Sequence, residues 1–245
     1  MQIFSVFALI LLPALAFVQD TPKKAPDPDT AKYSALLGKR VAKGRVDYEG
    51  LRADRAALDE YLKAAEDARG EHGLAFWINV YNASVLRDLV DSGKKLPAKV
   101  TDLKGFFDAK KHKVNGEERT LNELEGFVRK QWKDLRVHFA LNCGALSCPP
   151  LLPRAFTEEK LGATLEELTR TFLDGTGLVL DESKKELRAT KLLDWYKDDF
   201  VGKDGSLEAF LRKHVSDGKK LAALDPASGW RLAFQDYDWT PNARR

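Results

Sequence analysis

The 245-residue chain carries 40 basic and 37 acidic residues, which leave a net charge of +3. These charges form no basic block, so we expect no nucleic-acid partner. Apolar residues make up 44% of the chain, a fraction typical of globular proteins. Once the N-terminal apolar run is set aside, roughly 225 residues remain, which is enough for one well-buried domain. We therefore expect one core.

An apolar run, Met1–Phe17, opens the chain and ends in an Ala-Leu-Ala sequence. It is too short to span a membrane, and its small-residue ending predicts a signal peptide over residues 1–16. The mature protein is then secreted or periplasmic. Because no Lys or Arg precedes the apolar core, an uncleaved anchor is the alternative, and only in that case is the membrane a partner. Residues 17–30, rich in proline and charge, are expected to form a disordered tether.

The periodic part of the chain begins with two helices. Leucines spaced for one helical face predict helices over residues 31–42 and 51–68, joined by a brief extended link after Gly44. Both helices are interpreted as structural.

The next helix, over residues 74–90, has polar residues on two opposite sides. Asn79 and Asn82 project into the core, because at 100° per residue they lie opposite a charged stripe. A buried amide without partners costs a few kcal/mol, so both amides must be hydrogen-bonded. Two interpretations stay open: the amides secure the backbone, or they belong to a binding site. The stripe expected to face water consists of Ser84, Arg87, Asp88 and Asp91.

A loop-like stretch, residues 91–119, follows this helix and contains an Asn-Gly pair at Asn115 that suits a hairpin turn. Thr120 and Glu123 have the spacing of a capping box, which predicts that a helix begins directly after Thr120. Glu125 lies beside the apolar stripe of that helix, and we expect it to be solvated.

Residues 136–142 alternate between apolar and polar side chains, which predicts a strand. The alternation turns His138 and Asn142 to one face and Cys143 to the other, so Cys143 and His138 are not expected to meet. We hypothesise that the two buried amides of the long helix face His138 and Asn142.

Both cysteines, Cys143 and Cys148, lie five residues apart in this region. In an exported protein they can close a disulfide, or they are inert buried thiols. Alternatively, Cys148 folds back to His138, whose imidazole lowers the thiol pKa and makes Cys148 a nucleophile with His138 as its base. The residues expected to bind or orient are then Asn79, Asn82, Asn142 and Cys143. The cysteine spacing matches no common zinc pattern, so no metal and no cofactor is predicted.

The rest of the chain is interpreted as scaffold. The pattern predicts a helix after Thr157, a hairpin within residues 178–189, two short helices over 192–200 and 207–215, and a closing strand over 230–235. The remaining histidines, expected in loops or on the surface, are His72, His112 and His214.

Several blocks of this sequence resemble the domain-of-unknown-function family 547. The blocks are Phe76–Ala83, Leu121–Arg129 with Glu125, His138–Cys143 with Ser147–Pro150, Trp195–Tyr196 with Asp199–Phe200, and Tyr237–Trp239 with Asn242. The family is uncharacterised and its bacterial members are often exported, so the resemblance implies export but no activity. Its helix followed by a His-bearing strand is similar to papain-like and transglutaminase-like cores, where the helix supplies a cysteine. Here the helix carries asparagines instead, so only the fold is analogous.

The sequence thus predicts one α+β domain over residues 31–245, in which several helices pack on a small, mainly antiparallel sheet containing the His138 strand. Two functions stay open. The first is a thiol hydrolase or acyl transferase on an amide substrate, with Cys148 as nucleophile and His138 as base. The second is a non-catalytic exported binding or structural module with a Cys143–Cys148 disulfide. The expected partner is a small molecule or a peptide, and the oligomeric state is left open.

Overall fold

The computed structural model describes residues 27–244, so the predicted signal peptide and most of the predicted tether lie outside the described residues. The α-helices are α1 (Ala31–Arg40), α2 (Tyr48–Ala53), α3 (Ala56–Asp67), α4 (Leu74–Asp91), α5 (Leu121–Trp132), α6 (Leu161–Asp174), α7 (Leu192–Trp195), α8 (Lys197–Asp204), α9 (Leu207–His214) and α10 (Gly218–Ala223). The 3-10 helices are η1 (Val100–Asp102), η2 (Leu135–Phe139), η3 (Glu158–Lys160) and η4 (Pro226–Ser228). The strands are β1 (Val41–Ala42), β2 (Arg45–Val46), β3 (His112–Val114), β4 (Glu117–Arg119), β5 (Leu178–Asp181), β6 (Glu186–Ala189) and β7 (Arg231–Phe234).

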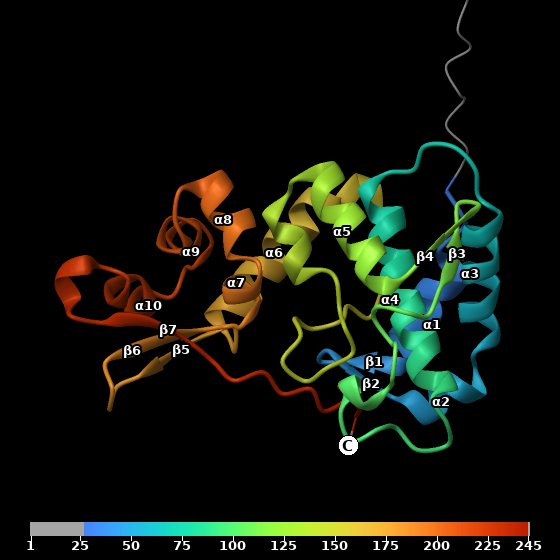
Figure 1. The fold of residues 1–245 in the computed structure, drawn as a ribbon, viewed down its shortest axis with the longest axis horizontal. Coiled ribbons are helices and arrows are strands. Elements are labelled where there is room, and N and C mark those ends of the chain that lie inside the picture. The colour runs from blue at the N-terminus through green and yellow to red at the C-terminus, as the bar shows by residue number, and fades with distance from the viewer. Residues whose placement is uncertain (1–26, 245) are drawn as a thin grey trace, which may run out of the picture.

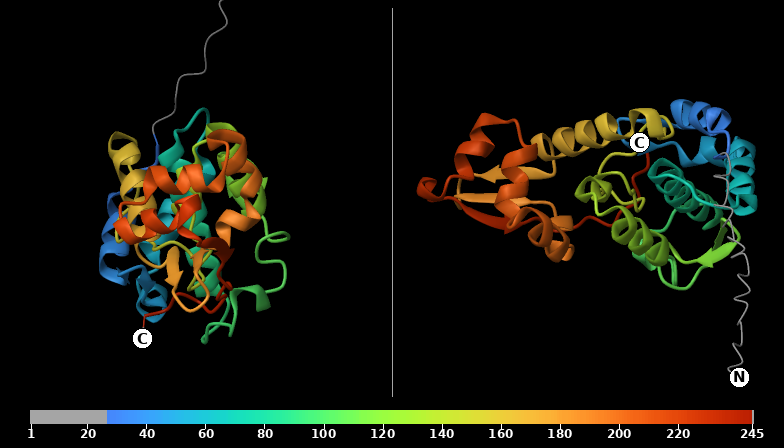
Figure 2. Two further views of the ribbon diagram at one scale, coloured as in Figure 1. Left: turned by 90° about the vertical axis from the view of Figure 1, so that its left-hand side faces the viewer. Right: turned by 90° about the horizontal axis from the view of Figure 1, so that it is seen from above.

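The molecule is elongated, and its two ends have different architectures (Figure 1). One end gathers α1–α5 with two small hairpins, whereas the other holds the β5–β7 sheet with α7–α10. Helix α6 runs along the long axis between them (Figure 2, right). The predicted α+β class is confirmed.

The strands form three separate sheets rather than the single sheet that the sequence suggested. Strands β1 and β2 pair with each other, as do β3 and β4, and β6 lies between β5 and β7. All of these pairs are antiparallel except β6 with β7, which are parallel. The predicted hairpin turn is confirmed, since Asn115 and Gly116 both have positive φ, 50° and 77°.

Two apolar clusters replace the one core that we expected. The first surrounds α4, and the second is centred on the rings of Phe139, Phe200 and Phe210. Helix α6 belongs to both: its first half, including Leu165, packs in the first cluster, and Phe172 packs in the second. The α6 helix therefore couples the two ends through apolar packing.

The strand predicted over residues 136–142 is wrong, because this segment forms the 3-10 helix η2 followed by irregular chain. Val137 packs in the first cluster while Leu135 and Phe139 pack in the second, so the segment is buried on more than one side. The side chain of Asp134 accepts a hydrogen bond from the Arg136 N–H and caps η2. The alternation of apolar and polar side chains thus reflects burial between two clusters. Because the segment is not a strand, the alternation does not turn Cys143 and His138 to opposite faces.

Asn79 and Asn82 of α4 are buried, as predicted, and they secure the backbone. The Asn79 side chain exchanges two hydrogen bonds with the backbone of Phe156, at 2.9 and 2.8 Å. Asn82 donates to the carbonyl of Ala140 at 2.9 Å and accepts from the Asn142 N–H at 2.8 Å. The Asn82 side chain thereby pairs with the backbone of the segment after η2, as a neighbouring strand would. The hypothesis that these amides face Asn142 holds for Asn82, but both lie against backbone groups rather than His138.

The stripe of α4 expected to face water is partly buried, which corrects the prediction. Ser84 and Asp88 are buried, and the segment that leads into β3 lies against Asp88. Asp88 lies 2.7 Å from the Nζ of Lys110 and 3.2 Å from the Nε2 of His112. His112, which we expected to have no partner, therefore lies buried beside a carboxylate.

The other two scaffold histidines are also buried, contrary to expectation. His72 lies 2.7 Å from Asp27, and His214 lies 3.1 Å from Glu166. Each histidine of the chain thus lies beside a carboxylate. At His72, His138 and His214 this carboxylate is also a hydrogen-bond partner of the buried imidazole.

The C-terminal tail leaves β7 and runs back across the molecule to the first end (Figure 1). The backbone of Val100 donates to Trp239, that of Leu146 donates to Thr240, and that of Val46 donates to Asn242, at 2.8 to 2.9 Å. The bond from Leu146 fixes the tail against the loop that carries the two cysteines, and the other two bonds fix it against η1 and β2.

Candidate functional site

A cavity of about 480 Å³ lies where the two ends of the molecule meet. Its wall combines α4, the loop after η1, α5, η2, the cysteine loop, α7 and the tail, which are remote from one another in the sequence. This volume lies in the usual range of small-molecule sites. The aromatic residues that line it are Tyr81, Phe106, Phe107, Trp195, Tyr196, Tyr237 and Trp239.

Three aromatic side chains from α7 and the tail pack together along one side. The rings of Trp195 and Trp239 are nearly parallel, with centroids 5.7 Å apart, and Tyr237 lies 4.7 and 4.6 Å from them. Trp195 is 44% exposed although it is large and apolar. An exposed tryptophan at a cavity is unusual for a purely structural ring and is typical of a binding surface.

His138 stands at the polar end of the cavity and is buried. Its Nε2 lies 3.0 Å from Asp199, and the same carboxylate accepts a 2.8 Å hydrogen bond from Arg129. The imidazole stacks on the ring of Tyr196, with centroids 4.4 Å apart. The nearest orienting group is therefore Asp199 of α8 rather than an asparagine.

Burial lowers the pKa of His138 to about 4, and the positive charge of Arg129 adds to the shift, while Asp199 opposes it. The imidazole is consequently neutral at pH 7. Because a carboxylate only accepts hydrogen bonds, the ring proton lies on Nε2, and Nδ1 carries the free electron pair.

Glu125 of α5 lines the same cavity, and the expectation that it is solvated is wrong. Its side chain is 17% exposed, and burial raises its pKa, while the Tyr196 hydroxyl and Arg129 oppose that shift. The sequence did contain a signal: Glu125 follows the buried Leu121 and Leu124 closely enough to share their side of the helix. A carboxyl with a raised pKa in a cavity is a recurrent mark of a functional site.

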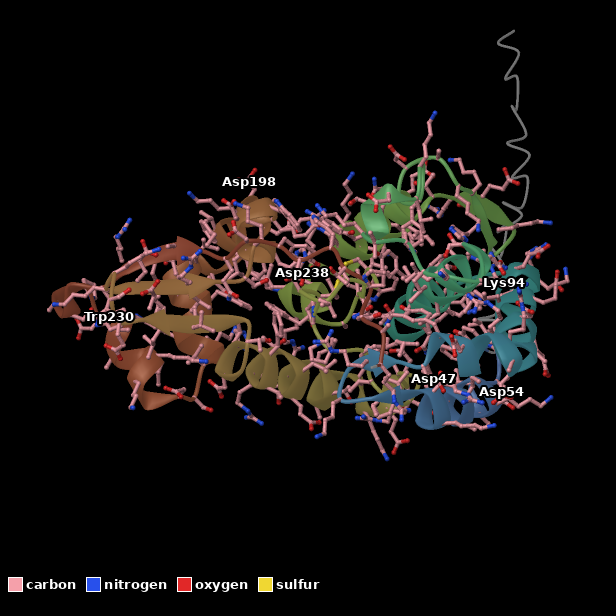
Figure 3. All side chains as sticks on the ribbon, turned by 90° about the horizontal axis from the view of Figure 1, so that it is seen from below. Asp47, Asp54, Lys94, Asp198, Trp230 and Asp238 are labelled. Atoms are coloured by element: carbon pink, nitrogen blue, oxygen red, sulfur yellow. A yellow bond between two sulfur atoms is a disulfide. The ribbon has the colours of Figure 1, made fainter. Side chains whose placement is uncertain are left out.

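Cys143 and Cys148 are bonded to each other in a disulfide, and both line the cavity. Figure 3 shows the bridge in the middle of the long axis, beside Asp238. The hydroxyl of Tyr237 lies 3.1 Å from each sulfur, and the N–H of Cys143 donates to the Cys148 sulfur at 3.0 Å. Within the described residues no cysteine is free. The nucleophilic role predicted for Cys148 therefore applies to a reduced form alone, and for that form it stays a prediction.

The three asparagines predicted to orient the imidazole are occupied elsewhere. Asn142 donates to the carbonyl of Pro149 at 2.7 Å and accepts from the Gly144 N–H at 2.9 Å. Asn79 and Asn82 bind backbone, as described above. The structure thus brings together His138, Cys143 and Cys148 at one cavity. The asparagines instead bind the backbone of neighbouring segments.

The chain is accordingly an α+β protein built around a mixed aromatic and polar cavity. Across residues 27–244, no group of three or more His, Cys, Asp or Glu side chains is placed to hold a metal ion. None of the helices in the described part of the chain is long and apolar enough to cross a membrane.

Residues 65–173 match the model of the family described as "Protein of unknown function, DUF547", so this part of the chain is similar to that family. The match confirms the resemblance drawn from the sequence for the blocks that lie within these residues. It covers α4, α5, η2 and both cysteines, whereas α7 and the tail, which complete the cavity, lie beyond it. Comparison with curated proteins gave no match. Comparison with solved structures gave none either, so the papain-like and transglutaminase-like analogy is not confirmed.

Proposed function

We propose that the protein is an exported binding module whose cavity takes a small, neutral, ring-bearing molecule rich in hydroxyl groups, such as a sugar. The observation that carries this proposal is that the aromatic side chains of Trp195, Tyr237 and Trp239 line the same cavity as the polar groups of Glu125 and His138. Aromatic faces pack on the apolar face of a sugar ring, and carboxyl and imidazole groups bind its hydroxyls.

The charges of the cavity favour a neutral ligand. His138 is uncharged at pH 7, and Glu125 is already disfavoured as a carboxylate by its burial. A second negative charge beside Glu125 would add repulsion where the local dielectric is low. The other charged side chains that line the cavity, Lys104 and Asp108, carry opposite signs. An anionic ligand is therefore expected to bind more weakly than its neutral counterpart.

The disulfide supports binding over thiol catalysis. Both sulfurs are bonded to each other, so the oxidised protein offers no thiolate for attack on an amide. The aromatic and polar groups of the cavity do not depend on a free thiol.

Tryptophan fluorescence tests the proposal directly. The oxidised protein is titrated with neutral mono- and disaccharides and, in parallel, with the corresponding uronic acids. We expect a saturable change with neutral sugars that Trp195→Ala removes. Trp230→Ala is the matched control, because Trp230 packs in the second apolar cluster at the far end of the molecule (Figure 3). If no neutral sugar binds at millimolar concentration, or if both variants behave alike, the proposal fails.

A second candidate function is a thiol hydrolase or acyl transferase that works after reduction of the bridge. The observation in its favour is that His138, held by Asp199, lines the same cavity as Cys148. In this form Cys148 attacks an amide or ester carbonyl, and the Nδ1 of His138 takes up the thiol proton. Hydrolysis of chromogenic esters by the reduced protein, lost in Cys148→Ser and absent from the oxidised protein, is the expected result; equal rates in all three forms would refute it.

A further inference from the structure

We propose that the Cys143–Cys148 bridge is redox-active: a small thiol that enters the cavity attacks Cys143 and releases Cys148 as a stabilised thiolate. This inference rests on the proposed function in one respect, that the cavity admits small molecules. It assigns the cavity a thiol–disulfide exchange reaction in addition to ligand binding.

The hydrogen bonds around the bridge are unequal, and they determine which sulfur leaves. Cys148 accepts from the Cys143 N–H at 3.0 Å and lies 3.1 Å from the Tyr237 hydroxyl, whereas Cys143 has only the shared hydroxyl. Donors aimed at a sulfur stabilise its thiolate, and the better stabilised thiolate leaves faster. The geometry therefore assigns Cys148 as the leaving group and Cys143 as the sulfur under attack.

Access to the two sulfurs agrees with this assignment. Cys143 is half-buried and faces the 480 Å³ cavity, while Cys148 is buried. Cys148 also lines a second cavity, of about 270 Å³, together with three basic side chains, Lys43, Arg45 and Lys191, and one acidic side chain, Asp236. Positive charge near a cysteine lowers its thiol pKa, so the excess of basic side chains in this lining favours the thiolate form of Cys148.

The cysteine loop is held in place by bonds other than the disulfide. The N–H groups of Leu146 and Ser147 donate to the tail at Thr240 and Asp238, at 2.8 and 3.2 Å. Asn142 binds Pro149, as described above, which closes the base of the loop. Reduction would therefore leave the two sulfurs beside each other, poised to form the bridge again, as exchange requires.

The reaction balances with two equivalents of thiol. The thiolate of the first thiol attacks Cys143 Sγ, a mixed disulfide forms there, and the Cys143–Cys148 bond breaks with its electron pair on Cys148 Sγ. A second thiolate then attacks the sulfur of the bound small molecule, which leaves as a symmetrical disulfide, and Cys143 becomes a thiolate. The protons released by the two thiols are available to the two cysteines. The protein gains two electrons, and the small thiols lose two.

The first experiment treats the native, oxidised protein with reduced glutathione at neutral pH, quenches with an alkylating agent, and maps both cysteines by mass spectrometry. The expected early product carries glutathione on Cys143 and the alkyl group on Cys148. Glutathione on Cys148 instead would overturn the assignment of the leaving group. A bridge that resists glutathione until denaturant is added would overturn the proposal, because the disulfide would then be structural.

The second experiment compares Tyr237→Phe with Tyr33→Phe. Tyr33 is the matched control, since its buried hydroxyl has no hydrogen-bond partner and lies on α1, away from the sulfurs. We expect Tyr237→Phe to slow alkylation of Cys148 in the reduced protein at pH 6 roughly tenfold, as the thiolate loses one charge-assisted hydrogen bond. Circular dichroism confirms that both variants fold. Identical rates in the two variants would show that Tyr237 does not stabilise the thiolate.

The two proposals fail separately. Sugar binding is measured on the oxidised protein without thiol, and exchange is measured without sugar. Loss of sugar binding with intact exchange removes only the binding proposal, and the reverse result removes only the redox proposal.

Discussion

Two buried histidine–aspartate pairs in this molecule have similar separations but differ in their hydrogen bonding and their surroundings. His138 lies 3.0 Å from Asp199, and His112 lies 3.2 Å from Asp88; the two imidazoles are 3% and 1% exposed. Asp88 is 1% exposed beneath Lys110, whereas Asp199 is 33% exposed and His138 lines a cavity. A paired, buried histidine is thus insufficient to mark a site. The cavity and the side chains that share it make the difference.

The largest loss of unfolding free energy is expected from disrupting the fully buried pair, His112 and Asp88. Asp88→Ala breaks the Asp88–Lys110 ion pair and leaves the buried His112 without its carboxylate; removal of the buried partner of an ion pair costs about 3 kcal/mol of unfolding free energy. Asp199→Ala is expected to cost about 1 kcal/mol, because its carboxylate is one-third exposed. Urea unfolding at pH 7 measures both, and equal losses would show that the two pairs do not differ as we describe.

The pH dependence of stability sharpens the comparison at His138. Its pKa is about 4 in the folded protein and near 6.5 when unfolded, so between these values the unfolded chain binds more protons. Stability is therefore complete above pH 6.5 and falls by about 3 kcal/mol as the pH drops to 4. Unfolding of His138→Gln, measured across this range, is expected to show a shallower fall. The same fall in both proteins would mean that the His138 imidazole is not held neutral.

Loss of the disulfide is expected to have an intermediate effect. The bridge closes a short loop, for which the chain-entropy model predicts about 2 kcal/mol of stabilisation. The double change Cys143→Ser with Cys148→Ser is expected to cost that amount or less, since the loop keeps its bonds to the tail. The fold should persist by circular dichroism. Unfolding of the double variant at room temperature would show that the bridge holds the cavity together.

The smallest expected effect concerns Glu125. Burial raises its folded pKa, so the folded state binds more protons than the unfolded state above the ordinary carboxyl pKa, and this contribution is lost as the pH rises. Glu125→Gln is thus expected to stabilise the protein slightly at pH 7 relative to pH 4, while weakening sugar binding. Thermal unfolding at both pH values checks the sign. A variant less stable at pH 7 than the unchanged protein would contradict the burial argument.

The elements set by local signals were predictable from the sequence. The α4 helix, its inward asparagines, the Thr120 capping box and the Asn115 hairpin all follow from spacing and turn chemistry within a few residues. The match of residues 65–173 to a family model likewise confirmed the resemblance for the sequence blocks within that range.

The site itself depended on contacts that local patterns do not encode. The alternation around His138 reads as a strand, yet it arises because the segment is buried between two apolar clusters. Asp199 is 61 residues from His138, and Tyr237 is 89 residues from Cys148. Glu125 was assigned to solvent although it shares the side of α5 that holds Leu121 and Leu124, because the side chains that share its cavity come from α7 and the tail, far along the chain.

The central claim, that this cavity binds a small ring-bearing ligand in the oxidised protein, is tested most directly by crystallographic fragment screening. Crystals of the disulfide-bonded protein are soaked with neutral sugars and other small ring compounds. The account predicts density for a sugar ring packed on Trp195 or Trp239, with a hydroxyl group at hydrogen-bond distance from Glu125 or His138. Fragments bound elsewhere on the protein, with only water in the cavity, would contradict it.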